Sequence, residues 1–141
     1  MDVIFDSNVF DNLISGELEI DIIKNKDHKI IVTHIQIDEL NECKDTEKRA
    51  QLFNRVVELK PEKISTETFV IGVSRIGSAK IGGSKIYDSI MRGNPKHIND
   101  ALIGETAVKN NLMLITNDIK LKKKILELGG KCMSVQEFKN L

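Results

Sequence analysis

Tryptophan is absent from the sequence, and the only aromatic residues are five phenylalanines and one tyrosine. Proteins that bind single-stranded nucleic acids by stacking need exposed aromatic side chains, so such platforms are scarce here. The 21 basic and 21 acidic residues cancel, and a net charge of zero gives no overall attraction to nucleic acids or membranes. Any affinity for a polyanion must therefore come from a local patch.

Cysteine is also scarce. Cys43 and Cys132 are the only two, and neither belongs to a CxxC motif, so we expect free, buried thiols in a reducing compartment. No apolar stretch approaches the roughly 18 residues of a membrane span, and no secretory signal pattern is present. These absences favour a cytoplasmic protein with no membrane partner. A length of 141 residues suffices for a substantial core, so we expect a single domain over residues 1–141.

What the sequence does contain is a series of short apolar runs separated by amphipathic stretches. The runs predict buried strands, and the stretches predict helices that cover them. With short connections, this order favours an α/β fold with three layers, α/β/α, around a central parallel sheet of four to five strands. We expect strands at residues 3–6, 29–33, 112–116 and 131–135 and an extended segment at 64–73. We expect helices at residues 9–14, 17–24, 35–43, 46–59, 97–111, 118–128 and 136–141.

One segment departs from this pattern. Five of the nine glycines lie between Gly72 and Gly93, and lysines and arginines are frequent there. We expect a flexible, locally basic segment, which is either a plain surface loop or a loop that contacts phosphates. The lysine-rich helix at 118–128 is either a solvated helix face or a second phosphate contact. The candidate substrate-binding residues are Lys80, Lys85 and Lys120.

Four acidic residues occupy suggestive positions. Asp6 ends the first strand, and Asp118 lies two residues beyond the strand at 112–116. Glu39 lies on the helix after the second strand, and Asp100 lies in the first turn of the helix at 97–111. Parallel strands end at the same edge of a sheet and the following helices begin there, so we expect these carboxylates to lie close together. After Asp6, the pair Ser7-Asn8 can cap the next helix.

A cluster of carboxylates is unfavourable because like charges repel, and a divalent cation relieves the repulsion. Hard oxygen ligands suit Mg²⁺ or Mn²⁺, which can activate a water molecule and stabilise a phosphoryl-transfer transition state. Taken alone, each acid also has an ordinary interpretation. Asp118 and Asp100 can cap helix N-termini, and Glu39 can belong to a solvated acidic face with Asp38 and Glu42.

Together, these positions resemble the PIN domain, the metal-dependent nuclease fold of many prokaryotic toxin–antitoxin toxins. The resemblance covers essentially the whole chain. Val3-Ile4-Phe5-Asp6-Ser7-Asn8 matches an opening strand that ends in D-x-N, and Glu39-Leu40 matches an E-L pair on the helix after the second strand. The C-terminal match is Pro95 to Ile103, which contains Asp100-Ala101, followed by Leu112 to Asp118, which ends in Thr116-Asn117-Asp118.

The resemblance implies a metal-dependent endoribonuclease that cleaves RNA phosphodiester bonds with an activated water. It implies that Asp6, Glu39, Asp100 and Asp118 are catalytic, and that Asp6, Asp100 and Asp118 hold Mg²⁺ or Mn²⁺. Asn8 and Thr116 would support this cluster. A small antitoxin partner and a homodimer are further implications of the family.

The chain departs from the family pattern in two places. Gly104-Glu105 interrupts the helix after the third acid, where the family has small residues. Glu105 either adds an acid near the site or faces solvent, and we expect it to face solvent. The segment from Gly72 to Gly93 is long and rich in glycine.

Two other functions stay open at this point. One is a non-catalytic PIN-like module that binds RNA or acts as a scaffold. The other is a phosphotransferase of the haloacid dehalogenase type, whose first strand also ends in a catalytic aspartate. That chemistry needs a second acid two residues later, and Asn8 counts against it.

Overall fold

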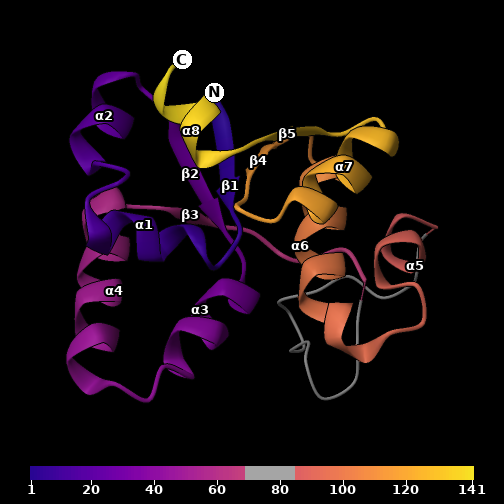
Figure 1. The fold of residues 1–141 in the computed structure, drawn as a ribbon, viewed down its shortest axis with the longest axis horizontal. Helices are drawn as coiled ribbons and strands as arrows, with labels where there is room; N and C mark the ends of the chain where they lie inside the picture. Colours follow the sequence, from indigo (N-terminus) through magenta and orange to yellow (C-terminus); the bar gives the residue numbers. More distant parts are fainter. Residues whose placement is uncertain (69–84) are drawn as a thin grey trace.

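The structure, a computed structural model, describes residues 1–68 and 85–141. In these residues five strands form one parallel sheet in the order β3-β2-β1-β4-β5, with helices on both sides (Figure 1). The α/β fold predicted from the sequence is therefore confirmed. The strands are β1 (Asp2–Phe5), β2 (Lys29–Val32), β3 (Glu62–Lys63), β4 (Met113–Ile115) and β5 (Lys131–Met133).

The helices alternate with the strands along the chain. Each of the predicted helices is present, with ends that differ by a few residues, and α5 and η1 are present in addition. The helices are α1 (Val9–Ser15), α2 (Ile20–Asn25), α3 (His34–Asn41), α4 (Thr46–Leu59), α5 (Lys85–Met91), the short 3-10 helix η1 (Pro95–His97), α6 (Ile98–Lys109), α7 (Ile119–Glu127) and α8 (Val135–Lys139).

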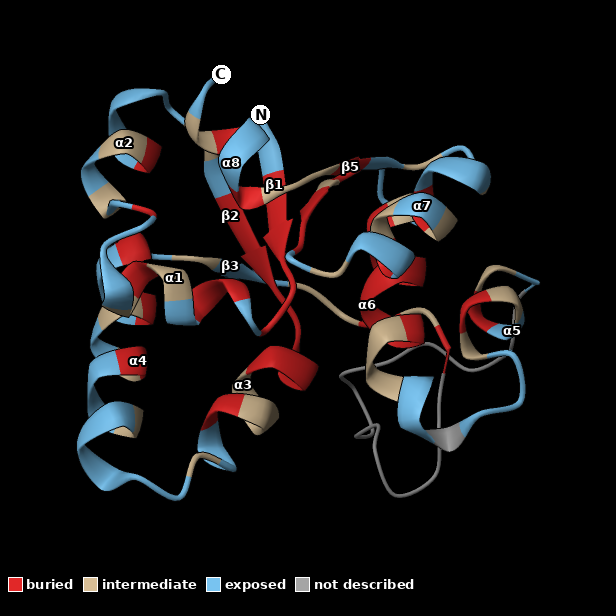
Figure 2. Ribbon diagram, in the orientation of Figure 1, coloured by how far each residue is buried: buried red, intermediate tan, exposed pale blue. Residues whose placement is uncertain are grey.

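Alternation of side chains along β1 divides the core into two halves. Val3 and Phe5 face a cluster formed by α1, α2, α4 and α8, whereas Ile4 faces a cluster formed by α3, α5, α6 and α7. All three side chains are fully buried, as expected for a strand covered on both faces. Figure 2 shows the same division, with the central strands buried between two helical layers.

The centre of the sheet is where the strand order reverses. From β1 the chain builds β2 and β3 on one side, then crosses to build β4 and β5 on the other. Ile4 pairs with Ile31 of β2 and with Leu114 of β4, so β1 lies between two parallel neighbours. In open parallel sheets, a crevice for ligands forms at such a reversal, outside the carboxyl ends of the strands. Here that crevice lies after β1 and β4.

Local sequence signals explain where several helices begin. Thr33 and Gln36 form a capping box at the start of α3. Asp45 accepts hydrogen bonds from the backbone amides of Glu47 and Lys48 at the start of α4. Ser134 forms a second capping box with Glu137 at the start of α8.

Helix α6 is buried almost all round, because the sheet covers one side and α5 and α7 cover others (Figures 1 and 2). Gly104 permits this close packing, since a Cβ atom there would lie 2.7 Å from Ile90 Cδ1 and 2.8 Å from Ile125 Cδ1. The expectation that Glu105 faces solvent is wrong. Glu105 is fully buried, and Thr68 Oγ1 donates a hydrogen bond to its Oε2 at 2.8 Å.

One further expectation needs correction. The glycine-rich segment was expected to be flexible as far as Gly93, but residues 85–91 form α5, whose Tyr87 and Ile90 are buried in the core. The two-residue strand β3 pairs with β2 just before the extended segment expected at 64–73, of which residues 69–73 lie outside the described residues. Residues 69–84, which include Lys80, lie outside the described residues.

None of the helices in residues 1–68 and 85–141 combines the length and the apolar character that crossing a membrane requires.

Candidate active site

Asp6 and Thr116 meet at the reversal of the strand order. Each follows directly on its strand, Asp6 after β1 and Thr116 after β4, and these strands are parallel neighbours. The Asp6 amide donates to the Ile115 carbonyl at 2.9 Å, which extends the pairing by one residue. Thr116 Oγ1 donates to Asp6 Oδ2 at 2.8 Å. Both side chains are buried, so this hydrogen bond fixes the direction of the Asp6 carboxyl group.

Asp118 is connected to the same pair. Its amide donates to Thr116 Oγ1 at 3.0 Å. Its Oδ1 accepts hydrogen bonds from the amides of Lys120 at 2.9 Å and Leu121 at 3.1 Å, so Asp118 is the N-cap of α7. The cap interpretation and the site interpretation are thus compatible, because the cap uses only one of the two carboxylate oxygens.

Asp100 and Glu39 approach the same point from two helices, α6 and α3. Burial, together with the smaller effect of the charges of Asp6 and Asp118, raises the pKa of Asp100 to about 6. Burial, together with the smaller effect of the charges of Asp6 and Asp100, raises the pKa of Glu39 to about 7. The two helices therefore bring Glu39 and Asp100 close enough to the strand-end acids for the carboxylates to repel one another.

Asp6 lies at the centre of this arrangement. Burial raises its pKa, the hydrogen bonds from Thr116 and from the Ser7 amide oppose this shift, and the charge of Asp118 adds to it. The structure thus brings Asp6, Glu39, Asp100 and Asp118 together at one edge of the sheet. It does not support a solvated acidic face for Glu39, which is half-buried.

Ser7 and Asn8 line one side of this edge. Asn8 is the N-cap residue of α1, but its backbone is helical and its side chain makes no capping hydrogen bond within the described chain, so the capping prediction for this residue is wrong. Asn8 is exposed instead. Ser7 Oγ is buried and has no hydrogen-bond partner in the described residues, although it lies near enough to Glu39 to favour its ionised form.

Pockets open on both sides of the acids. One, of about 270 Å³, is lined by Ser7, Asn8 and Glu39 together with Asp11, Glu42 and Lys48. The other, of about 140 Å³, is lined by Asp100 and Asp118 together with Arg92, His97, Lys120 and Lys124.

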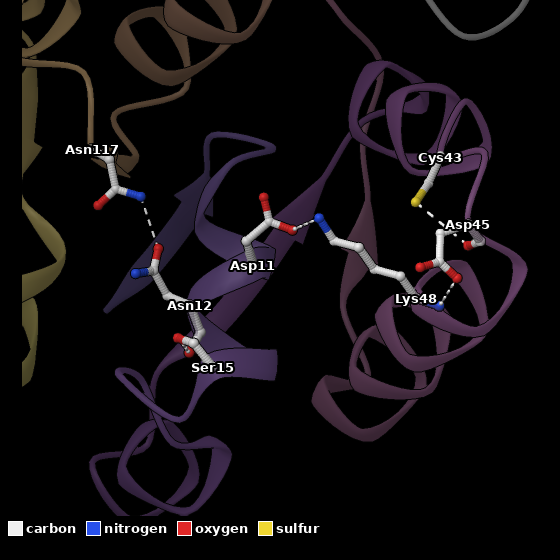
Figure 3. A network of polar contacts seen from close by, with 7 residues as sticks. All are labelled: Asp11, Asn12, Ser15, Cys43, Asp45, Lys48 and Asn117. Atoms are coloured by element: carbon white, nitrogen blue, oxygen red, sulfur yellow. Dashed lines mark hydrogen bonds and ion pairs between the residues drawn. The ribbon is translucent and has the colours of Figure 1, made fainter.

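Polar contacts connect α1 to two other segments (Figure 3). Asn117 Nδ2 donates to Asn12 Oδ1 at 2.8 Å and ties the loop after β4 to α1. Lys48 pairs with Asp11 at 3.2 Å and ties α4 to α1. Both contacts are between exposed side chains.

The three lysines predicted to bind substrate differ in their positions relative to the acids. Lys120 lines the smaller pocket beside Asp118. Lys85 is exposed at the start of α5 and does not line that pocket. Lys80 is outside the described residues. Sequence reasoning missed Arg92 as a site residue, because only the course of α5 brings it beside α7.

The donor set at this edge fits a hard divalent cation, because it consists of carboxylate oxygens that repel one another. As the side chains stand in residues 1–68 and 85–141, no group of three His, Cys, Asp or Glu residues is close enough to hold a metal ion. Mg²⁺ does not require such a cage, since one or two carboxylates commonly hold it and water molecules complete the shell. The residues present are therefore compatible with Mg²⁺ or Mn²⁺.

Comparisons of the sequence find no match, neither to a protein-family model nor to a curated protein. Comparison of the structure does find similar folds. VapBC2 from Rickettsia felis, in a structure bound to a DNA fragment from its promoter, is 18% identical with a TM-score of 0.54, and the match covers 95% of this chain and 98% of that one. VapBC-1 from nontypeable Haemophilus influenzae is 16% identical with a TM-score of 0.52, covering 96% and 99%.

A third similar structure is a PilT N-terminus domain protein from the hyperthermophilic archaeon Sulfolobus solfataricus P2. It is 16% identical with a TM-score of 0.55, and the match covers 99% of this chain and 92% of that one. Identities this low support the fold and not the activity. The five-stranded parallel sheet and its helices are nevertheless matched over nearly their whole length, so this chain has the fold of PilT N-terminus, or PIN, proteins, as its sequence resemblance predicts.

Proposed function

We propose that this protein is a Mg²⁺- or Mn²⁺-dependent endoribonuclease. The observation that carries the proposal is the convergence of four acids, from the residue after β1, from α3, from α6 and from the loop after β4, at the reversal of the strand order. Burial and the neighbouring acids raise the pKa values of Asp6, Glu39 and Asp100 there. Folding brings these charges together at a cost, and a site that binds a divalent cation explains why they converge.

In this proposal Asp6, Asp100 and Asp118 hold the cation. When bound, the ion supplies positive charge that acidifies a water molecule and stabilises the transition state at phosphorus. Thr116 holds the Asp6 carboxylate in place and Asn8 lies at the rim of the site. Glu39 is assigned to proton transfer, because its carboxyl group lies beside these acids without holding the ion. Before the ion binds, burial and the neighbouring acids raise the pKa of this group to about 7.

The experiment is an RNA cleavage assay with Mn²⁺ and, separately, with EDTA. We expect the wild-type protein to cleave RNA only with the metal. Asp100→Asn should lower the rate by at least about 100-fold, because it removes one negative charge that faces the cation. Asp21→Asn is the matched control, since Asp21 is exposed on α2 and belongs to the opposite helical layer. Equal cleavage by the wild type and Asp100→Asn would contradict the proposal.

A non-catalytic PIN-like module that binds RNA is the second candidate. The observation in its favour is that no three acids in the described residues are close enough for a metal cage. This candidate predicts RNA binding without cleavage in Mn²⁺ and no saturable uptake of the ion.

The proposal includes the partners that the PIN resemblance implies, a small antitoxin and a second copy of the chain. Purification together with the product of the neighbouring gene tests the first, and sedimentation of the purified protein tests the second. If the protein purifies as a monomer and without that gene product, both proposed partners are contradicted. The cleavage assay alone then tests the nuclease function.

A further inference from the structure

The surroundings of the four acids are not symmetric. On the side of Glu39 the pocket wall adds two more acids, Asp11 and Glu42, and its lysine, Lys48, is already paired with Asp11 at 3.2 Å. On the side of Asp100 and Asp118 the wall is basic. A polyanion therefore meets repulsion on one side of the acids and attraction on the other.

The basic side extends beyond the pocket next to the acids. A second recess, of about 230 Å³, is lined by Arg92, Lys120, Lys123, Lys124 and Glu127. It shares Arg92, Lys120 and Lys124 with the pocket next to the acids, so the two adjoin. We call the surface formed by Arg92, Lys120, Lys123 and Lys124 the basic groove.

Helix geometry explains why these lysines, and not their neighbour, line the groove. Lys120, Lys123 and Lys124 are spaced by three and four residues, so they lie on one face of α7. Lys122 lies off this face and pairs with Glu137. The lysine run thus combines a face that opens to the groove with a residue that fastens α7 to α8.

Arg92 forms the opposite wall. It follows directly on α5, and its amide donates to the Asp88 carbonyl at 2.9 Å. Its backbone is left-handed, with φ of 50°, which turns the chain away from α5 at this residue. The position of the Arg92 backbone is therefore determined by α5, which it directly follows.

Four cations around one groove repel one another unless an anion lies between them. Within residues 1–68 and 85–141, their one ion pair is that of Lys124 with Glu127, at 3.8 Å and at the end away from the acids. Arg92, Lys120 and Lys123 are exposed and form no ion pair in this part of the chain. The groove is thus suited to a group that carries several negative charges, such as the backbone of a nucleic acid.

We propose that the basic groove binds the RNA backbone on one side of the scissile bond, and that the Glu39 side of the acids binds no phosphate. This inference rests on the proposed function for the identity of the polyanion. It adds the path of the substrate, which runs from Asp100 and Asp118 outward along α7. It also adds Arg92 and Lys123 as residues that hold substrate without contacting the acids.

The test measures binding in EDTA, so that cleavage plays no part. The probe is a fluorescein-labelled single-stranded RNA decamer, and its anisotropy is followed at several KCl concentrations. The variants Arg92→Gln and Lys123→Gln each remove one charge of the groove. Each should weaken binding several-fold at low salt and reduce the slope of log K against log[KCl] by about 0.7, the value for one phosphate contact on a single strand.

Two controls make the test specific. Lys131→Gln removes an exposed lysine at the start of β5, outside the groove, and Lys48→Gln removes a lysine beside the acids on their opposite side. Neither should change the slope. Unchanged slopes in Arg92→Gln and Lys123→Gln would contradict RNA binding by the basic groove. A loss of affinity in Lys48→Gln as large as that in the groove variants would contradict binding on one side of the acids only. If the groove variants lose affinity but the wild type does not cleave RNA with Mn²⁺, the proposed catalytic function fails and the binding path stands.

Discussion

The hydroxyl of Thr116 donates to the carboxylate of Asp6 at 2.8 Å, although 110 residues separate the two in the chain. The same hydroxyl oxygen accepts a hydrogen bond from the Asp118 amide at 3.0 Å. One buried side chain therefore positions two of the four acids. It does so at the point where β1 and β4 lie side by side and the strand order reverses.

Replacing this hydroxyl by a methyl group tests its structural role. Thr116→Val should lower the free energy of unfolding by roughly 1–3 kcal/mol, because the buried Asp6 carboxyl loses a donor and the Asp118 amide loses an acceptor. Urea unfolding monitored by circular dichroism measures the change. Thr116→Ser keeps the hydroxyl and should recover most of the loss; a serine variant as unstable as the valine variant would show that packing dominates.

Asp118 both caps α7 and belongs to the four acids, and two substitutions separate these roles. Asp118→Asn keeps an oxygen that can cap α7 but removes the charge, so it should retain stability and lose activity. Asp118→Ala removes both and should be less stable by about 1 kcal/mol. Thermal unfolding and the RNA cleavage assay measure the two effects. Comparable stability of the two variants would mean that the cap at Lys120 and Leu121 contributes little.

The raised pKa values of Glu39 and Asp100 predict how stability depends on pH. A carboxyl group whose folded pKa lies above its ordinary value binds protons more readily in the folded state, so its contribution favours folding at low pH and is lost as pH rises. For pKa values of about 7 and about 6, the loss falls between roughly pH 4 and pH 7. Glu39→Gln should remove the upper part of this decline.

The measurement is urea unfolding of the wild type and Glu39→Gln in EDTA, from pH 4.5 to pH 7.5. The difference between the two proteins is the quantity to compare, because histidines titrate in the same range. We expect Glu39→Gln to gain stability relative to the wild type as pH rises. A constant difference between the two proteins would mean that Glu39 does not titrate in this window.

His28 has the opposite effect on the pH dependence. Its ring packs on Phe138 at 5.0 Å, and both its nitrogens are buried without a hydrogen-bond partner among the described residues. Burial lowers the pKa of His28, with help from the charges of the N-terminus and Lys26. The neutral ring is therefore favoured in the folded state, and stability is lost as pH falls below about 6.5.

His28→Phe should stabilise the protein by about 1 kcal/mol, because it removes two buried polar atoms and keeps an aromatic contact with Phe138. The gain should be larger at pH 5.5 than at pH 7.5, as measured by thermal unfolding. His28→Gln is the control, since it removes the titration but keeps a polar side chain. A gain of equal size at both pH values would contradict the titration of His28.

The sequence predicts the strand-end acids well, for a physical reason. Asp6 follows a short apolar run that predicts a buried strand, and Thr116-Asn117-Asp118 follows another. In a parallel sheet such positions meet at one edge whatever the helices do. The bounds of α4 are also predictable, because Asp45 caps it and Pro61 follows it.

What the sequence does not predict depends on packing between distant elements. Helix α5 was not predicted, because the sequence around it is rich in glycine and its Tyr87 and Ile90 become buried only against α6. Without α5, Arg92 cannot be placed beside the lysines of α7. Glu105 is typical of an exposed helix position, and it is buried because α6 is covered on several sides and Thr68 supplies a donor.

Binding of a divalent cation by Asp6, Asp100 and Asp118 together is the central claim, and titration calorimetry with Mn²⁺ at pH 7.5 tests it most directly. We predict saturable binding by the wild-type protein, weakened at least tenfold in both Asp6→Asn and Asp100→Asn and unchanged in Asp21→Asn. If the wild type shows no saturable binding, or if the two cluster variants bind Mn²⁺ as tightly as the wild type, the acids do not form a metal site.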